Sequence, residues 1–259
     1  MPVRIMAIGD VVGRPGRRFL KNRLPQLIER EAVDFVIANG ENVAGGLGIT
    51  PATAQALHDA GVHVITTGDH VWRRRDVEQA LLEDPHLLRP HNFPAGAPGT
   101  GVVTATTDGG VPIRVINLLG RIYLEPVDCP FECVERVLEM SPGPPITIVD
   151  FHAEATSEKG AMARFLDGRV SAVLGTHTHV QTADECVLEN GTAFITDLGM
   201  TGAINSIIGR RADQVIRKFR TRLFVPMEVA TGPVRLCGVV LTVDPESGRA
   251  VEIRRLVEQ

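Results

Sequence analysis

The chain is poor in aromatic residues and has no long apolar run. Aromatic side chains make up 4% of the 259 residues, so aliphatic side chains must fill the core. Hydrophobic residues still reach 44% against 22% charged residues, which favours a large core and argues against wholesale disorder. No run approaches the roughly 18 apolar residues that a membrane span needs, and we see no signal peptide. We therefore expect a cytoplasmic protein with no membrane segment.

Cysteine is scarce too, and its spacing does not suit metal binding. The four cysteines are Cys129, Cys133, Cys186 and Cys237, and none forms a Cys-x-x-Cys pair. In a cytoplasmic protein this spacing indicates ordinary reduced thiols. A thiolate-rich structural zinc site is not expected, because no cysteine falls at the end of a predicted strand.

The charge balance limits the partners. The formal net charge is -4, with a pI near 6.1. Long nucleic acids bind through basic surfaces that neutralise phosphates, so we do not expect them as partners. A small phosphate-bearing ligand remains compatible, because bound metal ions can supply local positive charge.

Tandem repeats, low-complexity tracts and long linkers are also missing, so we predict a single domain over residues 1–259. The apolar runs are short and bounded by glycine, which suits buried strands. Asp244 to Gly248 separates two late apolar runs, which predicts a C-terminal β-hairpin. Helical patterns occur over Pro15–Ile28 (with Pro25 as a break or kink), Pro51–Ala60 (capped by Thr50), Val77–Leu82 and Cys133–Met140. The alternation of strands and helices predicts a layered α/β fold.

Polar side chains follow many of the predicted strands. In α/β sheets ligands gather outside the carboxyl ends of strands, so these residues can form one site. Carboxylates and imidazoles together suit Mn, Fe or Zn, and eight candidates exceed the needs of one ion. We therefore expect a pair of metals bridged by one carboxylate. The candidates are Asp10, Glu41, Asn42, Asp69, His70, His152, His177 and His179.

Each candidate alone has a simpler interpretation. Asp10 could cap the following helix, and Glu41-Asn42 could lie in a solvated turn. The strongest single pattern is His177-Thr178-His179, because alternation in an extended segment would place both rings on one side. Two surface histidines are the alternative there.

The order of these motifs resembles the calcineurin-like metallophosphoesterases. Gly-Asp, Gly-Glu-Asn, Gly-Asp-His, a lone strand-end His and Gly-Thr-His-Thr-His occur in that order. In detail the chain is similar to the bacterial YmdB-like cyclic-nucleotide phosphodiesterases from about Asp10 to Gly209. The segments that carry this resemblance are GDVVGRPGR, GENVAGGLGIT, TTGDHVW, NLLGRIYLEPVDCPF, DFHAEATSEK, GTHTHVQTAD, ITDLGMTG and SIIG.

The resemblance implies a four-layer αββα sandwich, with two sheets face to face and helices outside. It also implies that Glu41 bridges two divalent metals, iron or manganese first, with zinc and magnesium as alternatives. His70 would stand beside them as a proton donor. One metal would be held by Asp10, Glu41, Asn42 and His179, and the other by Glu41, Asp69, His152 and His177.

The chain departs from the resemblance at Asp69, where the family usually has asparagine. Three carboxylates against two divalent ions leave one net positive charge, whereas an asparagine there would leave two. The added carboxylate should hold metal more tightly and reduce its Lewis acidity. In the broader superfamily a histidine stands two residues after the first aspartate, where this chain has Val12, and Asn42 takes that ligand's place.

The expected function is hydrolysis of small phosphoesters, with 2′,3′- or 3′,5′-cyclic nucleotides as the substrate class that the resemblance implies. His91 and Arg121 lie on candidate rim loops, and the glycines Gly45, Gly46 and Gly48 would let backbone approach a phosphate. A homo-oligomer is also expected from the resemblance.

The first alternative function is that of a metal-loaded regulatory or nucleotide-binding protein with little catalysis. An amidohydrolase is the second, but its His-x-His pair follows the first barrel strand, and eight regular βα units are not evident here.

Overall fold

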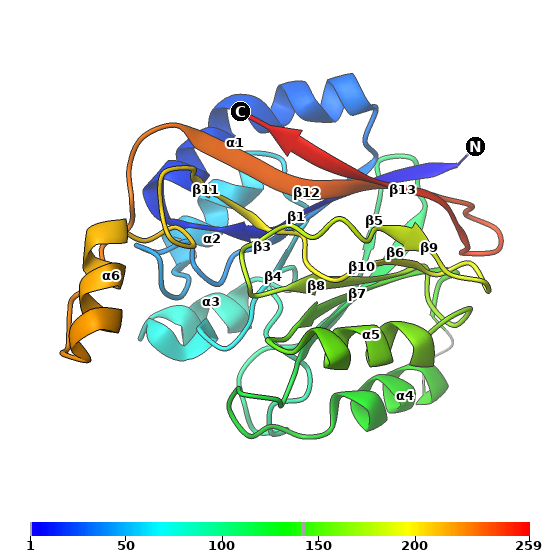
Figure 1. Ribbon diagram of the computed structural model, residues 1–259. Coiled ribbons are helices and arrows are strands. Elements are labelled where there is room, and N and C mark those ends of the chain that lie inside the picture. The colour runs from blue at the N-terminus through cyan, green and yellow to red at the C-terminus, as the bar shows by residue number, and fades with distance from the viewer. Residues whose placement is uncertain (1, 141–142) are drawn as a thin grey trace.

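A computed structural model describes residues 2–140 and 143–259. In these residues it has two mixed β-sheets that lie face to face, with helices on the outer side of each (Figure 1). The predicted αββα sandwich is therefore confirmed. No helix among the described residues is both long enough and apolar enough to cross a membrane.

The first sheet contains the N-terminal strand and the C-terminal hairpin. Its strand order is β2-β11-β12-β1-β3-β4, with β13 paired to β12. β1, β3 and β4 run parallel, whereas β12 is antiparallel to β1. The strands are β1 Val3–Ile8, β2 Asp10–Val11, β3 Phe35–Asn39, β4 Val64–Thr66, β11 Met200–Ala203, β12 Val234–Val243 and β13 Ala250–Glu258.

The second sheet has the order β5-β6-β7-β8-β10-β9. β6, β7, β8 and β10 run parallel, and β5 and β9 are antiparallel edge strands. The strands are β5 Val102–Thr106, β6 Pro112–Leu119, β7 Ile146–His152, β8 Ala172–Thr176, β9 Cys186–Val187 and β10 Ala193–Ile195.

The helices cover the outer faces of the sheets. α1 to α3 belong to the side of the first sheet, whereas α4 and α5 cover the second sheet (Figure 1). α6 stands apart from both layers. The helices are α1 Gly13–Glu31, α2 Pro51–His58, α3 Val77–Glu83, α4 Pro130–Met140, α5 Thr156–Phe165 and α6 Ala212–Thr221, with a 3₁₀ turn η1 at Val71–Arg73.

Three apolar cores separate the four layers. Alternate residues of β1 serve two of them: Ile5 points into the core between the sheets, and Met6 into the core beneath α1. The third core joins Phe151 of β7 to Val134 of α4 and Met162 of α5. Because the central strands are buried on both faces, they read as continuous apolar runs in the sequence.

Local sequence signals explain several element ends. Thr50 caps α2 as predicted: its Oγ1 accepts from the Thr53 amide at 3.2 Å, and Thr53 Oγ1 accepts from the Thr50 amide at 2.9 Å. Gly61 follows shortly after the end of α2, and its φ of 108° suits glycine. Pro25 does not end α1, which continues to Glu31. The packing of Leu24 and Leu27 against the first sheet offsets the lost hydrogen bond.

The fold generates a pH-dependent prediction at the end of α2. His58 Nε2 lies 2.9 Å from Asp84 Oδ2. Burial opposes the charged form of His58, but the hydrogen bonds to Asp84 and to the Val62 carbonyl outweigh it and raise the pKa of His58. A raised histidine pKa stabilises the fold fully below the unfolded pKa, and this contribution is lost as pH rises through the folded pKa. The loss should therefore occur as pH rises above the ordinary histidine pKa.

His58→Gln should lower the free energy of unfolding by about 0.5–1 kcal/mol in mildly acidic buffer, and by little in alkaline buffer. Urea unfolding at a series of pH values measures the difference. His86→Gln is the control, because His86 lies beside the same helices and has its backbone, not its ring, bonded to Asp84. A pH-independent difference between His58→Gln and the parent would contradict the prediction.

Candidate metal centre

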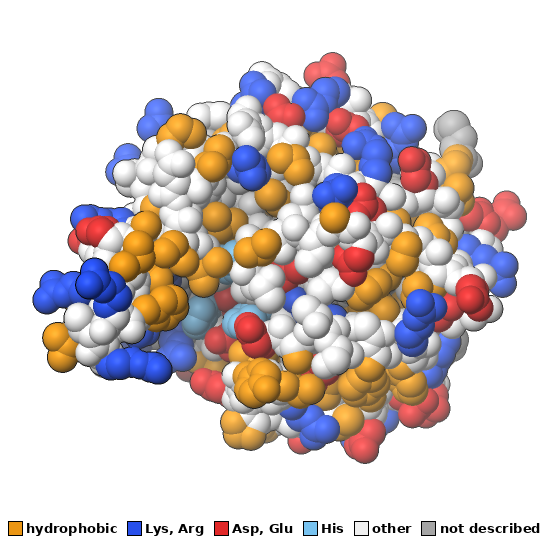
Figure 2. All heavy atoms as spheres, in the orientation of Figure 1, with side chains coloured by type: hydrophobic (Ala, Val, Ile, Leu, Met, Phe, Trp, Pro, Cys, Tyr) orange, Lys and Arg blue, Asp and Glu red, His pale blue; other side chains and the backbone are white. Residues whose placement is uncertain are grey.

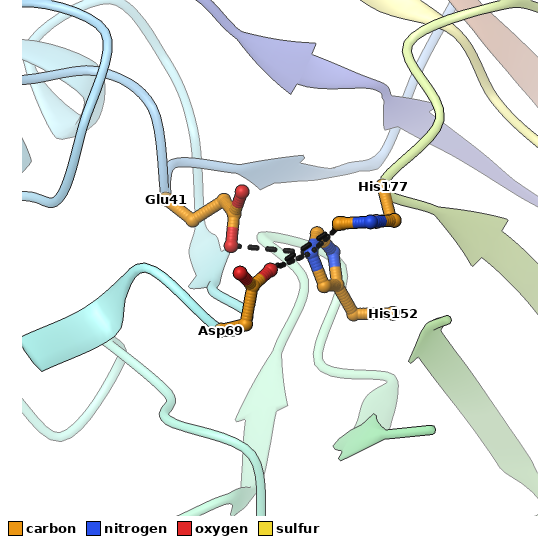
Figure 3. Close-up of side chains that lie close together, drawn as sticks. All are labelled: Glu41, Asp69, His152 and His177. Atoms are coloured by element: carbon orange, nitrogen blue, oxygen red, sulfur yellow. Dashed lines mark hydrogen bonds and ion pairs between the residues drawn. The ribbon is translucent and has the colours of Figure 1, made fainter. Parts of the chain in front are cut away.

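The ends of strands from both sheets converge on one cluster of acids and histidines. Two groups have ligand-type atoms within 4.8 Å of one another, and both contain Glu41. The first group is Glu41, Asp69, His152 and His177, whose side chains point toward a common centre (Figure 3). The second is Asp10, Glu41 and His179. Histidine side chains are visible at the bottom of a hollow beside α6 (Figure 2).

The first group is packed closely around His152. Its Nε2 lies 3.1 Å from Glu41 Oε2 and 3.2 Å from Asp69 Oδ1. His177 Nδ1 lies 3.0 Å from the same nitrogen and 3.3 Å from Asp69 Oδ1. The backbone of Gly68 packs against the same group, because a Cβ added to Gly68 would lie 2.3 Å from Glu41 Oε2. Only glycine fits at that position.

The second group is built around a buried carboxylate. Asp10 is fully buried, and its Oδ1 has no hydrogen-bond partner. The nearest ion-pair contact of this oxygen is His179 Nε2 at 3.6 Å. An oxygen left without a donor at this depth is costly unless a cation satisfies it.

Asn42, the fourth residue predicted for this group, lies beside it but presents its nitrogen. Its Nδ2 is 2.7 Å from Glu41 Oε1 and 3.1 Å from His179 Nε2, whereas its Oδ1 faces His70 Nδ1 at 3.0 Å. A half-turn of the amide would exchange the two atoms. The oxygen would then face the group, as a metal ligand requires.

The outer nitrogens of two histidines show which atoms face inward. His179 Nδ1 lies 2.9 Å from the Ile208 carbonyl, and His177 Nε2 lies 3.0 Å from Glu154 Oε2. Both partners are acceptors, so each outer nitrogen carries the proton. His179 Nε2 and His177 Nδ1 therefore turn lone pairs toward the cluster.

The outer nitrogen of His152 also donates to an acceptor, and here the acceptor is a hydroxyl group. Its Nδ1 lies 2.9 Å from Thr176 Oγ1, which donates its own proton to Asp150 Oδ1 at 2.7 Å. Thr176 can then only accept from His152 Nδ1, so the inward Nε2 is the nitrogen available to bind a cation. Three inward imidazole nitrogens beside three carboxylates form a donor set that fits divalent cations.

The electrostatics agree with a site for positive charge. Burial alone would raise the pKa of Glu41, but the imidazole of His152 and hydrogen bonds from His152 and His70 bring it well below its usual range. Burial likewise opposes charge on His152, yet Glu41 and Asp69 raise the pKa of His152 well above its usual value, so its Nε2 holds a proton that a bound cation would displace. The carboxylates are thus held ionised.

His70 lies beside the cluster and contacts two of its carboxylates, Glu41 after β3 and Asp69 after β4. Its Nδ1 is 3.0 Å from Glu41 Oε1, and its Nε2 is 3.6 Å from Asp69 Oδ2. Burial opposes the charged ring, but Glu41 outweighs this effect and raises the pKa of His70. A quarter of the side chain is exposed, so a bound molecule can reach it.

The segment His177-Thr178-His179 differs from the expected extended strand. β8 ends at Thr176, and both histidines have positive φ, 102° for His177 and 65° for His179. The two rings therefore enter different groups that share Glu41, and do not lie on one side of a strand.

A buried ion pair outside the cluster supports this turn. Asp197 Oδ2 accepts from Lys159 Nζ at 2.8 Å and from the Thr178 amide at 3.0 Å, and both charged side chains are fully buried. Neither residue was among the candidates predicted from the sequence. The two residues are 38 positions apart, and only the fold joins them.

Other supporting residues also escaped the sequence analysis. Asp150 receives hydrogen bonds from Thr176 and Thr66, and burial raises its pKa to about 6 although those bonds oppose the rise. Asp150 stands inside β7 and is followed there by Phe151 and His152. Its position two residues before His152, on the same face of the strand, was the available signal.

The two proposed rim residues lie outside both groups. The backbone amide of Arg121 donates to Glu158 at 2.9 Å, and its side chain is exposed. The backbone of His91 packs against Gly101, and its Nδ1 is buried without a partner. The structure shows no contact of either residue with the acids and histidines described above.

The comparisons with known proteins agree with this site. The model of the family described as YmdB-like protein matches residues 6–256. The chain belongs to the YmdB-like family. A Bacillus subtilis relative named 2′,3′-cyclic-nucleotide 2′-phosphodiesterase is 45% identical over 256 residues, which cover 98% of this chain and 97% of the relative.

Solved structures show the same fold. A hypothetical protein from Thermus thermophilus is 42% identical, with a TM-score of 0.93 and 99% of both chains covered. A phosphatase from Mycoplasma pneumoniae is 33% identical, with a TM-score of 0.94, and the match covers 100% of this chain and 94% of that one. With its cluster of potential metal ligands, the present chain is an enzyme that hydrolyses phosphoesters.

The buried ion pair yields a stability prediction. Lys159→Met should lower the free energy of unfolding by about 3–5 kcal/mol, because it leaves the Asp197 carboxylate buried without its countercharge. Urea unfolding of the metal-free protein measures this loss. Lys21→Met is the matched control, since Lys21 is exposed on α1 and should change stability by less than about 0.5 kcal/mol. Similar losses in the two variants would refute the role of the pair.

Proposed function

We propose that the chain is a dinuclear-metal phosphodiesterase acting on small phosphodiesters. The observation that carries this proposal is the pair of groups that share Glu41, each with carboxylate oxygens and inward imidazole lone pairs. Asp10, Glu41, Asn42 and His179 would hold one cation. Glu41, Asp69, His152 and His177 would hold the other.

Two divalent cations in these positions would supply the positive charge that activates water and stabilises phosphoryl oxygens. In the reaction, water adds its oxygen to phosphorus, one ester P–O bond breaks, and the leaving oxygen takes up a proton. His70 is the donor in our proposal. Its ring lies beside Glu41 and Asp69, is partly exposed, and has a pKa that Glu41 raises above the ordinary histidine value, which favours the protonated ring.

For the substrate we propose cyclic nucleotides. The name of the Bacillus relative supports the 2′,3′ form, while the 3′,5′ form stays a prediction from the family resemblance. Iron or manganese are the preferred cations for a mixed carboxylate and imidazole site. The single domain, the cytoplasmic location and the homo-oligomer also stay predictions.

The decisive experiment compares the parent with His70→Ala on 2′,3′- and 3′,5′-cyclic nucleotides in the presence of Mn²⁺. We expect about two metals per chain by elemental analysis and no hydrolysis after chelation. His70→Ala should lower kcat by roughly 10²–10⁴-fold, since a positioned proton donor contributes that much.

His86→Ala is the control, because His86 lies away from both groups and should retain full activity. Equal background rates in the parent and His70→Ala would favour the alternative of a regulatory or nucleotide-binding protein. Asp69 is the feature that keeps this alternative under test, because its extra negative charge reduces Lewis acidity.

Asp69→Asn is a separate prediction. Asp69 Oδ1 lies within 3.3 Å of both His152 Nε2 and His177 Nδ1, so its charge acts directly on the first group. Asparagine should preserve folding, weaken metal retention and raise kcat at saturating Mn²⁺. Elemental analysis after dialysis and kcat at saturating metal test this. Identical kinetics and metal content in both forms would rule out a special role for Asp69.

A further inference from the structure

Glu154 contacts one of the proposed ligands, His177, but is itself neither a proposed ligand nor the proposed proton donor. It lies between β7 and α5, two residues after His152, and its Oε2 is 3.0 Å from His177 Nε2. Nearly half of the Glu154 side chain is exposed, at 48%, whereas the ring of His177 is 18% exposed. A half-exposed carboxylate is thus aimed at the outer nitrogen of an inner histidine.

This contact differs from those at the other two histidines. The outer nitrogen of His152 meets the Thr176 hydroxyl, and that of His179 meets the Ile208 carbonyl. Both of those partners are neutral. Glu154 is the one charged group among the three outer partners, and a carboxylate on the outer N–H makes an imidazole a stronger ligand.

His177 also has greater need of an external support. It follows the last residue of β8, and its φ of 102° removes it from the sheet geometry that would fix its ring. Its backbone amide donates to Asp10 Oδ2 at 3.2 Å, which anchors the main chain but not the ring. On the outer side, the ring is oriented by its bond to Glu154.

We propose that Glu154 is a positioning residue that fixes His177 with its Nε2 protonated and its Nδ1 directed inward. As a result, the group of Glu41, Asp69, His152 and His177 binds a cation more tightly than the group of Asp10, Glu41, Asn42 and His179. The charges agree: each group has two carboxylates, with Glu41 shared, and Glu154 adds a further negative charge behind the first group, whereas the outer partner of His179 in the second group is a neutral carbonyl. This inference rests on the proposed function, since it assumes that both groups bind cations.

The test is calorimetric titration of the metal-free full chain with Mn²⁺ alone. The parent should show two binding events of different affinity. Glu154→Ala should weaken the tighter event by roughly 10–100-fold, the usual effect of losing an outer partner of a metal-binding histidine. Glu154→Gln should lie between, because its amide oxygen still accepts from Nε2 but carries no charge. The weaker event should stay unchanged in both variants.

Glu135→Gln is the matched control: Glu135 is similarly exposed at 42% and pairs with Arg169 on α4's side of the molecule. Thermal unfolding of the metal-free variants distinguishes a positioning role from a structural one. All three variants should have the same melting temperature as the parent. A lower melting temperature for Glu154→Ala would instead assign Glu154 a structural role and overturn the inference.

The remaining outcomes separate the inference from the function on which it rests. Two binding events with unchanged affinities in Glu154→Ala would overturn the role of Glu154 and leave the dinuclear site intact. Equal weakening of both events would overturn its assignment to the first group. Failure of the parent to bind Mn²⁺ at all would overturn both this inference and the proposed function.

Discussion

The rest of the structure serves to hold carboxylates and imidazole nitrogens close together at one buried point. Glu41 is shared by two groups of such atoms, and Asp10 leaves one oxygen with no donor. Like charges and facing lone pairs repel strongly where water is excluded. The fold must hold them together with energy from elsewhere, and positive charge placed between them relieves the repulsion.

That energy comes from burial of apolar side chains between two sheets whose strand ends meet at the site. The core between the sheets fixes β1 and β3 against β7 and β8, so ligand-bearing segments from different sheets cannot drift apart. Behind the ligands stands a further set of polar contacts. Asp150 orients Thr176 and through it His152, while Asp197 braces the turn at Thr178 with the help of Lys159. Each of these is buried and specific, as precise metal geometry requires.

Much of the fold could be predicted because its central strands are short apolar runs, and the family resemblance added the four layers. Strand ends were misjudged where polar residues lie inside the sheet. β7, for example, continues through Asp150 to His152, because Thr66 and Thr176 satisfy the carboxylate there. Nothing local in the sequence reveals such a partner. α6 escaped for the opposite reason: its residue Val215 alone is buried, so little of its pattern is set by a core.

The candidate site was visible as residue types at strand ends, but not as geometry. An alternation rule suggested that His177 and His179 share one side of a strand, whereas two left-handed residues send them to different groups. Asn42 was predicted as a metal ligand from its position alone, and its amide nitrogen lies toward Glu41 and His179. Backbone conformation and amide orientation depend on neighbours distant in sequence, which periodicity does not contain.

The position of β12 has a consequence for how the protein is made. This strand lies between β1 and β11 and also carries β13, yet it follows all of the proposed metal ligands along the chain. Until it emerges from the ribosome, β1 has an unpaired edge, and β11, which pairs with β2 at Asp10, has no neighbour on its other side. During synthesis the chain therefore exposes an unpaired, apolar sheet edge, and such edges are prone to aggregation. Completion of the first sheet requires β12, so a chain that stopped before this strand would lack the support of the site even though it contained every proposed ligand.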